Sequence, residues 1–217
     1  MSAQSPMGTV LYGSPSTASL VVHWLLIELG IEHELVMLDF GKREQKSPEY
    51  LKLNPQGRVP TLLIDGQVLT ESTAIAMHLA DLYPQAGLAP APGSAARAAY
   101  YRWMLFAAYT LMPAFRAWFY SDEVAGEEHA EAVRTRARAA IESAWEQVDA
   151  HLAANGPYLL GESMSAVDFV FTMLMRWSRN MPRPGDSWPA LSALAARTKA
   201  LPSFREAYAR EGIEDWT

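Results

Sequence analysis

The segment GRVPTLLIDGQVLTES, residues 57–72, contains two features that could bind a small polar ligand. The first is Val59-Pro60, which stands where an apolar strand begins, although proline cannot donate a hydrogen bond to a sheet. If the bond before Pro60 is trans, which is the commoner form, the proline simply opens the strand. If the bond is cis, the N–H and C=O of Val59 turn out of the sheet and can pair with an extended peptide.

The second feature is Glu71-Ser72, directly ahead of a helical pattern. Ser72 is a natural N-cap, and the free N–H groups and positive dipole end of a helix N-terminus suit a ligand carboxylate. The carboxylate of Glu71 suits a ligand ammonium group. Together they could recognise the head group of an α-amino acid, although ordinary capping beside an exposed glutamate would give the same pair.

The amino-acid composition excludes several kinds of functional site and partner. The chain has 217 residues and no cysteine, which excludes disulfides, thiolate metal sites and any mechanism in which the protein supplies the thiol. A net charge of −6 argues against a nucleic-acid partner. The five histidines are scattered without metal-ligand spacing, so we expect no metal.

No targeting or membrane segment is expected. The N-terminus MSAQSPM lacks the basic-then-apolar layout of a signal peptide. The best apolar run, residues 20–29, contains His23 and Glu28 and is too short to span a bilayer. These features predict a soluble, cytoplasmic protein that does not enter the membrane.

Strand-like and helix-like patterns alternate over residues 9–83 in the order βαβαββα. The expected strands are 9–13, 33–38, 60–64 and 67–70, and the expected helices are 17–29, 47–53 and 72–83. Asp65-Gly66, between the last two strands, is a strong hairpin signal. This α/β order predicts a mixed four-stranded sheet with helices packed on it.

Strand patterns are absent from the sequence after a stretch rich in Pro, Gly and Ala, and an all-α bundle is expected instead. Residues 94–120 and 126–155 form two long amphipathic patterns, and Pro113 should kink the first. Ser165 and Asp168 form a variant capping box ahead of a buried helix. We therefore expect domains at 1–87 and 94–217, joined by a linker at 88–93.

The ordered motifs LYGSPSTAS, NPQGRVPTLLIDGQVLTESTAIAMHLADLYP and GESMSAVDF resemble the bacterial cytosolic glutathione S-transferases, over essentially residues 9–210. The resemblance implies a thioredoxin-like first domain that binds glutathione as co-substrate and a helical second domain that lines the electrophile site. It also implies that the Val59-Pro60 bond is cis. A homodimer is implied too, and the aromatic-rich start of the second domain (Tyr100, Tyr101, Trp103) agrees with one.

The resemblance also assigns roles within the glutathione site. Val59, next to Pro60, would pair with the cysteinyl backbone of glutathione, while Glu71 and Ser72 would hold its γ-glutamyl amine and carboxylate. Arg58 occupies a position that often contacts glutathione as a glutamine.

Two further basic residues precede this segment in the sequence and could contribute to the glutathione site. Lys42 and Arg43 could reach the glycyl carboxylate of glutathione, or they could form a solvated charge cluster.

Transfer of glutathione to an electrophile needs the glutathione thiol as a thiolate. A free thiol has a pKa of about 8.5, so the protein must lower that pKa. By resemblance, Ser16 stands where serine-type members keep their serine, and Tyr12 where tyrosine-type members keep their tyrosine. The position of the catalytic cysteine in other bacterial members is Ala18, which is inert. Ser16 is the first candidate, Tyr12 or Thr17 the next and Ser14 the last, although Ser16 could instead cap the first helix.

An electrophile pocket is expected from Tyr109, Met112 and Phe115, which lie about one turn apart, although core packing would give the same stripe. The expected activity is transfer of the glutathione thiolate to small hydrophobic electrophiles. A glutathione-dependent disulfide or peroxide reductase, and a non-catalytic binding or regulatory protein, are the alternatives.

Overall fold

A computed structural model describes residues 8–217 and groups them into two compact units. The first unit contains the residues up to 86 together with residues 200–215, and the second contains residues 87–199. Residues 200–215 thus join the first unit, although they were expected in a helical domain of residues 94–217. The expected boundaries at 87 and 94 stay a prediction.

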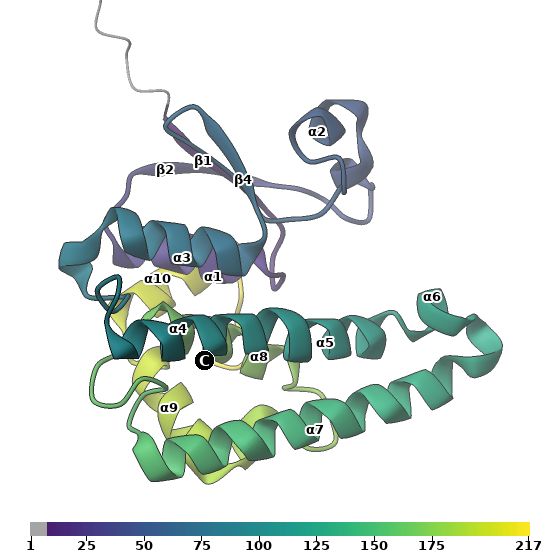
Figure 1. The fold of residues 1–217 in the computed structure, drawn as a ribbon. Coiled ribbons are helices and arrows are strands. Elements are labelled where there is room, and N and C mark those ends of the chain that lie inside the picture. The colour runs from purple at the N-terminus through teal and green to yellow at the C-terminus, as the bar shows by residue number, and fades with distance from the viewer. Residues whose placement is uncertain (1–7) are drawn as a thin grey trace, which may run out of the picture. The chain divides into compact units, whose positions relative to one another are not determined.

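The first unit has the βαβαββα order that the sequence predicts (Figure 1). Its strands are β1 (Thr9–Gly13), β2 (His33–Met37), β3 (Thr61–Ile64) and β4 (Gln67–Thr70). Its main helices are α1 (Ser19–Glu28), α2 (Pro48–Leu53), α3 (Ser72–Leu82) and α10 (Pro202–Glu211), with short 3₁₀ turns at Glu44–Lys46 and Pro84–Ala86. The sheet order is β2-β1-β3-β4, with β1 parallel to β2 and the other pairs antiparallel, so the sheet is mixed as expected.

Local sequence explains two features of this unit. Asp65 and Gly66 have φ values of 49° and 74°, the left-handed pair that a two-residue hairpin turn requires. Ser47 caps α2 by accepting the N–H of Tyr50 at 3.2 Å, and Pro48 occupies the first turn, where its missing N–H costs nothing.

The core of the first unit lies between the sheet and its helices. Figure 1 shows α1 and α3 on one side of the strands and α2 on the other. Helix α10 packs on α1, where the indole of Trp24 lies 5.0 Å from the ring of Phe204 and donates to the hydroxyl of Ser203 at 2.9 Å. His23 and Glu211 form a buried contact of 2.9 Å between the same two helices.

The second unit is helical, as predicted. It contains α4 (Ala95–Phe106), α5 (Met112–Phe119), α6 (Ser121–Ala125), α7 (Ala130–Asn155), α8 (Ala166–Trp177) and α9 (Pro189–Lys199), with 3₁₀ turns at Glu127–His129 and Gly185–Ser187. A π-helical segment, Ala107–Leu111, joins α4 to α5, so Pro113 falls in the first turn of α5. There its missing N–H needs no partner, and the irregularity that the sequence placed at Pro113 lies just before it.

The capping box predicted at the start of α8 is confirmed. The N–H and hydroxyl of Ser165 donate to Oδ2 of Asp168 at 2.7 and 3.1 Å, and the N–H of Leu159 donates to Oδ1 at 2.9 Å. Burial raises the pKa of the Asp168 carboxyl to about 6, although these hydrogen bonds act in the opposite direction. Asp168 therefore ties the preceding loop to the helix that it caps.

Candidate active site

The strand register defines one row of residues across the sheet. Tyr12 pairs with Val36 of β2 and with Thr61 of β3, and Thr61 pairs with Thr70 of β4. Neighbouring strands lie about 4.8 Å apart, so the row is about 14 Å wide. An extended tripeptide, at about 3.3–3.6 Å per residue, fits along it.

The chain segments that leave this row carry the predicted binding residues. The loop Ser14–Ala18 follows β1, Val59-Pro60 precedes β3, and Glu71-Ser72 follows β4. The segment after β2 leads to Lys42. Residues that are up to 58 positions apart in the chain, from Ser14 to Ser72, therefore leave one end of a single sheet.

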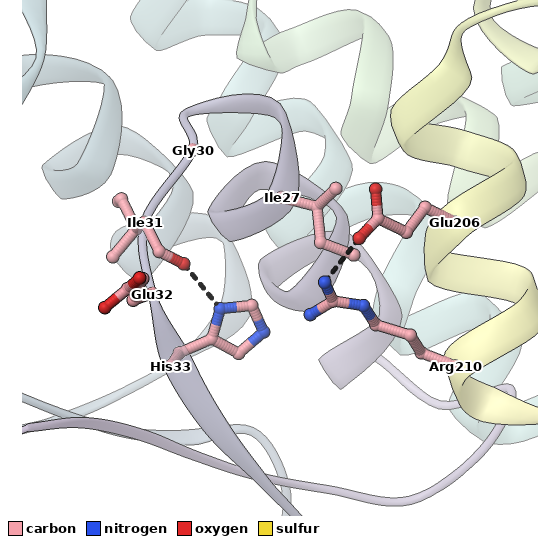
Figure 2. Close-up of a pocket in the computed structure, with 7 residues that line it drawn as sticks. All are labelled: Ile27, Gly30, Ile31, Glu32, His33, Glu206 and Arg210. Atoms are coloured by element: carbon pink, nitrogen blue, oxygen red, sulfur yellow. Dashed lines mark hydrogen bonds and ion pairs between the residues drawn. The ribbon is translucent and has the colours of Figure 1, made fainter.

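A cavity of about 530 Å³ lies at the other end of α1 (Figure 2). It is lined by residues that include Gly30, His33 and Arg210 and by none of the predicted site residues. Arg210 pairs with Glu206, and His33 Nδ1 lies 2.7 Å from the carbonyl oxygen of Ile31. Burial lowers the pKa of His33. This cavity is not the predicted site.

The loop between β1 and α1 begins with a tight turn. The N–H of Thr17 donates to the carbonyl of Ser14 at 3.3 Å, with Pro15 and Ser16 at the two central positions. Ser16 has a φ of 63°, and proline followed by a positive φ is the pattern of a type II turn. Helix α1 begins at Ser19 with Ala18 as its N-cap, so Ser16 does not cap it.

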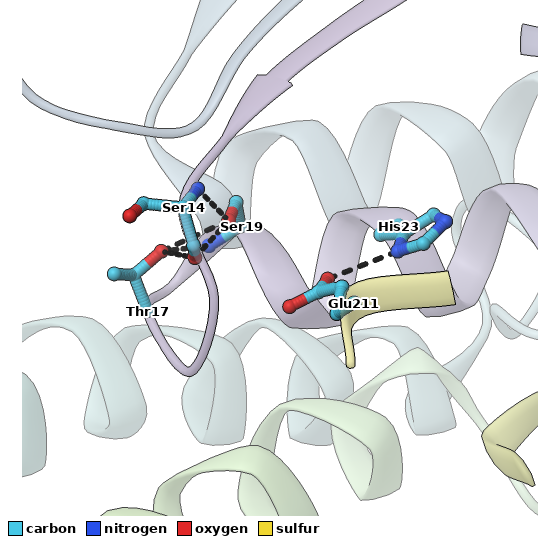
Figure 3. A network of polar contacts seen from close by, with 5 residues as sticks. All are labelled: Ser14, Thr17, Ser19, His23 and Glu211. Carbon is cyan, nitrogen blue, oxygen red and sulfur yellow. Dashed lines mark hydrogen bonds and ion pairs between the residues drawn. The ribbon is translucent and has the colours of Figure 1, made fainter. Parts of the chain in front are cut away.

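Hydroxyl groups reinforce this turn (Figure 3). The hydroxyl of Thr17 donates to the carbonyl of Ser14 at 2.7 Å, and the N–H of Ser14 donates to the hydroxyl of Ser19 at 3.1 Å. The two hydroxyl oxygens lie 2.9 Å apart. Tyr12 is half-buried, with its ring 5.6 Å from the ring of Tyr50.

The segment ahead of β3 is held by side chains that the sequence analysis did not single out. The hydroxyl of Tyr50 and the side-chain amide of Asn54 donate to the carbonyl of Arg58, at 2.6 and 2.8 Å. Both side chains are 4% exposed. The Val59-Pro60 bond is cis, which confirms that expectation. In the sequence, Tyr50 belongs to a helix and Asn54 marks its end, and neither pattern signals a contact with Arg58.

The N-terminus of α3 differs by one residue from the expectation. The helix begins at Ser72, and Glu71 is its N-cap, so the prediction that Ser72 is the N-cap is wrong. The reason is that Glu71 has φ 68° and ψ 105°, outside the helical region, whereas Ser72 is already helical. The first helical bond runs from the N–H of Ile75 to the carbonyl of Glu71 at 2.9 Å, which leaves the earlier N–H groups without an intrahelical acceptor.

The two predicted cations lie on the loop after β2. Lys42 Nζ is 3.3 Å from Asp39 Oδ2 in an exposed pair. The backbone N–H and ammonium of Lys42 lower the pKa of the Asp39 carboxyl. Arg43 follows with a positive φ of 58°.

The residues predicted to line the electrophile pocket lie in the second unit and differ in their exposure to solvent. Tyr109 is 78% exposed, Met112 is half-buried and Phe115 is fully buried. The ring of Phe115 lies 5.7 Å from that of Trp177 and 6.3 Å from that of Trp145. Core packing therefore accounts for Phe115, whereas Tyr109 presents its ring to solvent.

Within residues 8–217, no helix is long and apolar enough to cross a membrane. In the same range, no group of three or more histidine and carboxylate side chains could hold a metal ion.

Comparisons with known proteins agree with the motifs. Residues 7–81 match the family described as glutathione S-transferase, N-terminal domain, and residues 131–210 match glutathione S-transferase, C-terminal domain. The glutathione S-transferase GST-4.5 of Xanthomonas campestris is 31% identical over 204 residues, covering 94% of this chain and 98% of the relative.

Solved structures extend the comparison to the fold. A Sulfitobacter glutathione transferase homologue with bound glutathione has a TM-score of 0.86 at 27% identity, covering 95% of this chain and 99% of its own. A sphingomonad glutathione S-transferase complexed with glutathione has a TM-score of 0.82 at 30% identity, covering 94% and 100%. The chain therefore belongs to the glutathione S-transferase family of enzymes, as its motifs predicted.

Proposed function

We propose that this protein binds glutathione at the end of the sheet defined by the row from Val36 to Thr70 and transfers its thiolate to small hydrophobic electrophiles. The strand register supports this proposal, because it brings the four segments that carry the predicted binding residues to the same end of the sheet. Two structural relatives contain bound glutathione, which supports glutathione as the ligand.

In the proposed complex, the γ-glutamyl end of glutathione lies at the start of α3. The exposed carboxylate of Glu71 holds the ammonium group, while Ser72 and the free N–H groups of the first turn hold the carboxylate. The backbone of Val59 pairs with the cysteinyl residue.

The glycyl end of glutathione lies near the cations of the site. Lys42 exchanges its exposed partner Asp39, a pair of small energetic value, for the glycyl carboxylate. Arg58 is exposed beside Val59 and contacts the same end of the peptide.

The proposed thiolate donor is Ser16. Its hydroxyl donates a hydrogen bond to the sulfur, which favours the charged form and lowers the thiol pKa. Thr17 is a weaker candidate, because its proton is donated to the carbonyl of Ser14. Tyr12 remains the second candidate.

The electrophile is proposed to contact apolar surface of the second unit. Tyr109 and Met112 have side-chain surface to offer, and Phe115 supports them from the core.

We also propose a homodimer. Tyr101 and Leu105, which are 45% and 49% exposed, lie on successive turns of one face of α4, an arrangement that favours burial in a partner. A cytoplasmic location fits the chemistry, because a reducing compartment keeps the glutathione thiol reduced.

Two assays on the purified chain test the activity. Conjugation of glutathione to a generic aryl halide is expected, whereas reduction of a glutathione-linked disulfide without conjugation would indicate a reductase. Glutathione binding without either reaction would indicate a binding or regulatory protein.

A further inference from the structure

We propose that Thr17 and Ser19 are positioning residues, whose hydroxyls hold the β1–α1 loop so that Ser16 presents its own hydroxyl to the glutathione sulfur. This inference rests on the proposed role of Ser16 as thiolate donor. In this proposal the hydroxyls of Thr17 and Ser19 do not contact the sulfur.

Ser19 holds both polar backbone groups of Ser14. The N–H of Ser14 donates to the Ser19 hydroxyl at 3.1 Å, and that hydroxyl lies 3.1 Å from the Ser14 carbonyl. Ser19 is the first residue of α1 and is 1% exposed. The end of β1 is thereby fastened to the start of a buried helix.

The hydroxyls of Thr17 and Ser19 each have one proton to donate. Thr17 donates to the Ser14 carbonyl at 2.7 Å and accepts the N–H of Ser19 at 3.3 Å. Ser19 has two acceptors in reach, the Ser14 carbonyl at 3.1 Å and the Thr17 hydroxyl at 2.9 Å. Both protons have acceptors inside the network, so neither hydroxyl needs a ligand to satisfy it.

The network requires a close approach between Gly13 and Ser19. A Cβ atom on Gly13 would lie 2.7 Å from the Ser19 hydroxyl oxygen and 3.0 Å from its Cβ. The last residue of β1 must therefore lack a side chain for Ser19 to reach Ser14.

The consequence for Ser16 follows from its place in the turn. Ser16 precedes Thr17 and has a φ of 63°, in the left-handed region that L-residues disfavour. Without the bonds on either side of it, the turn can relax toward negative φ and move the Ser16 hydroxyl. A misplacement of about 1 Å at a reacting group can cost on the order of a hundredfold in rate.

Thr17→Val, Thr17→Ser and Ser19→Ala test the proposal. Valine matches threonine in shape and removes the hydroxyl, whereas serine keeps it. We expect Thr17→Val and Ser19→Ala each to lower kcat at pH 7 about tenfold and to raise the pKa of bound glutathione, measured by thiolate absorbance against pH. The Kd for glutathione should stay within about twofold, and Thr17→Ser should restore most of the rate.

The same substitutions in a Ser16→Ala background separate positioning from direct donation. If Thr17 and Ser19 act through Ser16, their effects on the thiol pKa should largely vanish once the Ser16 hydroxyl is gone. If Thr17→Val retains its full effect in that background, Thr17 is itself the donor and the proposal is overturned.

The remaining outcomes distinguish this proposal from the proposed function. If Ser16→Ala raises the thiol pKa but Thr17→Val and Ser19→Ala do not, Ser16 keeps its role and the positioning proposal fails. If Ser16→Ala leaves the thiol pKa unchanged, the donor assignment fails first, and the positioning of Ser16 falls with it.

Discussion

Ser16 and Glu71 are both held with positive φ, at 63° and 68°. Such conformations cost about 1–3 kcal/mol in non-glycine residues and persist where the surrounding structure imposes them, often at functional sites. They are two of the five non-glycine residues with positive φ in residues 8–217. Glycine would suit both backbones better, and the ligand contacts proposed for Ser16 and Glu71 would account for the side chains at these positions.

Ser16→Ala and Ser16→Gly form a matched pair, because both remove the hydroxyl but only glycine relieves the positive φ. We expect both to lower the conjugation rate at pH 7 by about tenfold to a hundredfold and to raise the bound thiol pKa by about one unit, with partial recovery of rate at higher pH. Ser16→Gly should also be the more stable of the two in denaturant unfolding. If Tyr12→Phe alone moves the thiolate titration, the tyrosine is the donor.

Glu71→Ala removes the proposed partner of the glutathione ammonium. We expect glutathione affinity to fall by about 1.5–3 kcal/mol, the range for hydrogen bonds to charged groups, as measured by calorimetry. Glu34→Ala, at an exposed position of β2, is the control for the loss of one negative charge. Equal affinities for Glu71→Ala and the wild type would contradict the ligand assignment.

At the scale of elements, two hydrogen-bonded joints hold loops against helices. In the first unit, Tyr50 and Asn54 of the α2 region hold the carbonyl of Arg58 ahead of β3. In the second unit, Asp168 of α8 holds the N–H groups of Leu159 and Ser165. Both sets of hydrogen bonds bury polar side chains together with their partners. We therefore expect the first to affect glutathione affinity and the second to affect the stability of the fold.

Tyr50→Phe keeps the aromatic ring of Tyr50 against Tyr12 but loses the hydrogen bonds that its hydroxyl makes with the Arg58 carbonyl and the Thr61 hydroxyl. We expect glutathione affinity to fall about threefold to tenfold, since the net value of such a bond is about 0.5–1.5 kcal/mol and the Arg58 carbonyl, next to Val59, keeps only the hydrogen bond from Asn54. Tyr83→Phe, which removes a hydroxyl at the end of α3, is the matched control. Calorimetry that gives both variants wild-type affinity would show that the joint does not position Val59.

The raised pKa of Asp168 should make the free energy of unfolding depend on pH. Burial raises its pKa in the folded state from 3.8 to about 6, so the folded protein binds the proton more tightly than the unfolded chain does. The contribution of this group is therefore fully present below about pH 4 and is lost as the pH rises through about 6, to a total of about 3 kcal/mol.

The comparison with Asp168→Asn isolates this contribution, because asparagine does not titrate and the other carboxylates are common to both proteins. We expect the free energy of unfolding of the wild type minus that of the variant to shrink between pH 4 and pH 7, measured by urea unfolding. A difference that grows over this range would mean that the hydrogen bonds to the carboxylate outweigh its burial.

At the scale of the whole molecule, exposed apolar side chains favour self-association. Tyr101 and Leu105 share a face of α4 and are about half exposed, so this face is the proposed dimer contact. Glutathione binding by the first unit needs no residue from a second chain in the arrangement proposed here. Association and ligand binding can therefore be tested separately.

Leu105→Glu should weaken the dimer, because a charge buried at an apolar contact is unfavourable without a partner. We expect the wild type to have about twice the chain mass of 24.0 kDa in light scattering at micromolar concentration, and the variant to shift toward that single mass. Glu131→Ala, on the exposed start of α7, is the control for a surface change. A wild-type protein of single-chain mass would contradict the dimer.

The sequence by itself determined the features that depend on neighbours in the chain. The order of elements in residues 9–83, the Asp65-Gly66 hairpin, the Ser47 cap of α2 and the Ser165–Asp168 capping box are all as predicted, because turn and cap preferences act over a few residues.

Only the tertiary structure decided which distant residues meet. No sequence pattern indicates that Tyr50 and Asn54 hold the Arg58 carbonyl, that Ser19 holds both polar groups of Ser14, or that residues 200–215 join the first unit. The one-residue error at the start of α3 has the same origin, since Glu71 has a backbone conformation that its own propensity does not favour. Strand register and packing impose these contacts, and both depend on the folded chain as a whole.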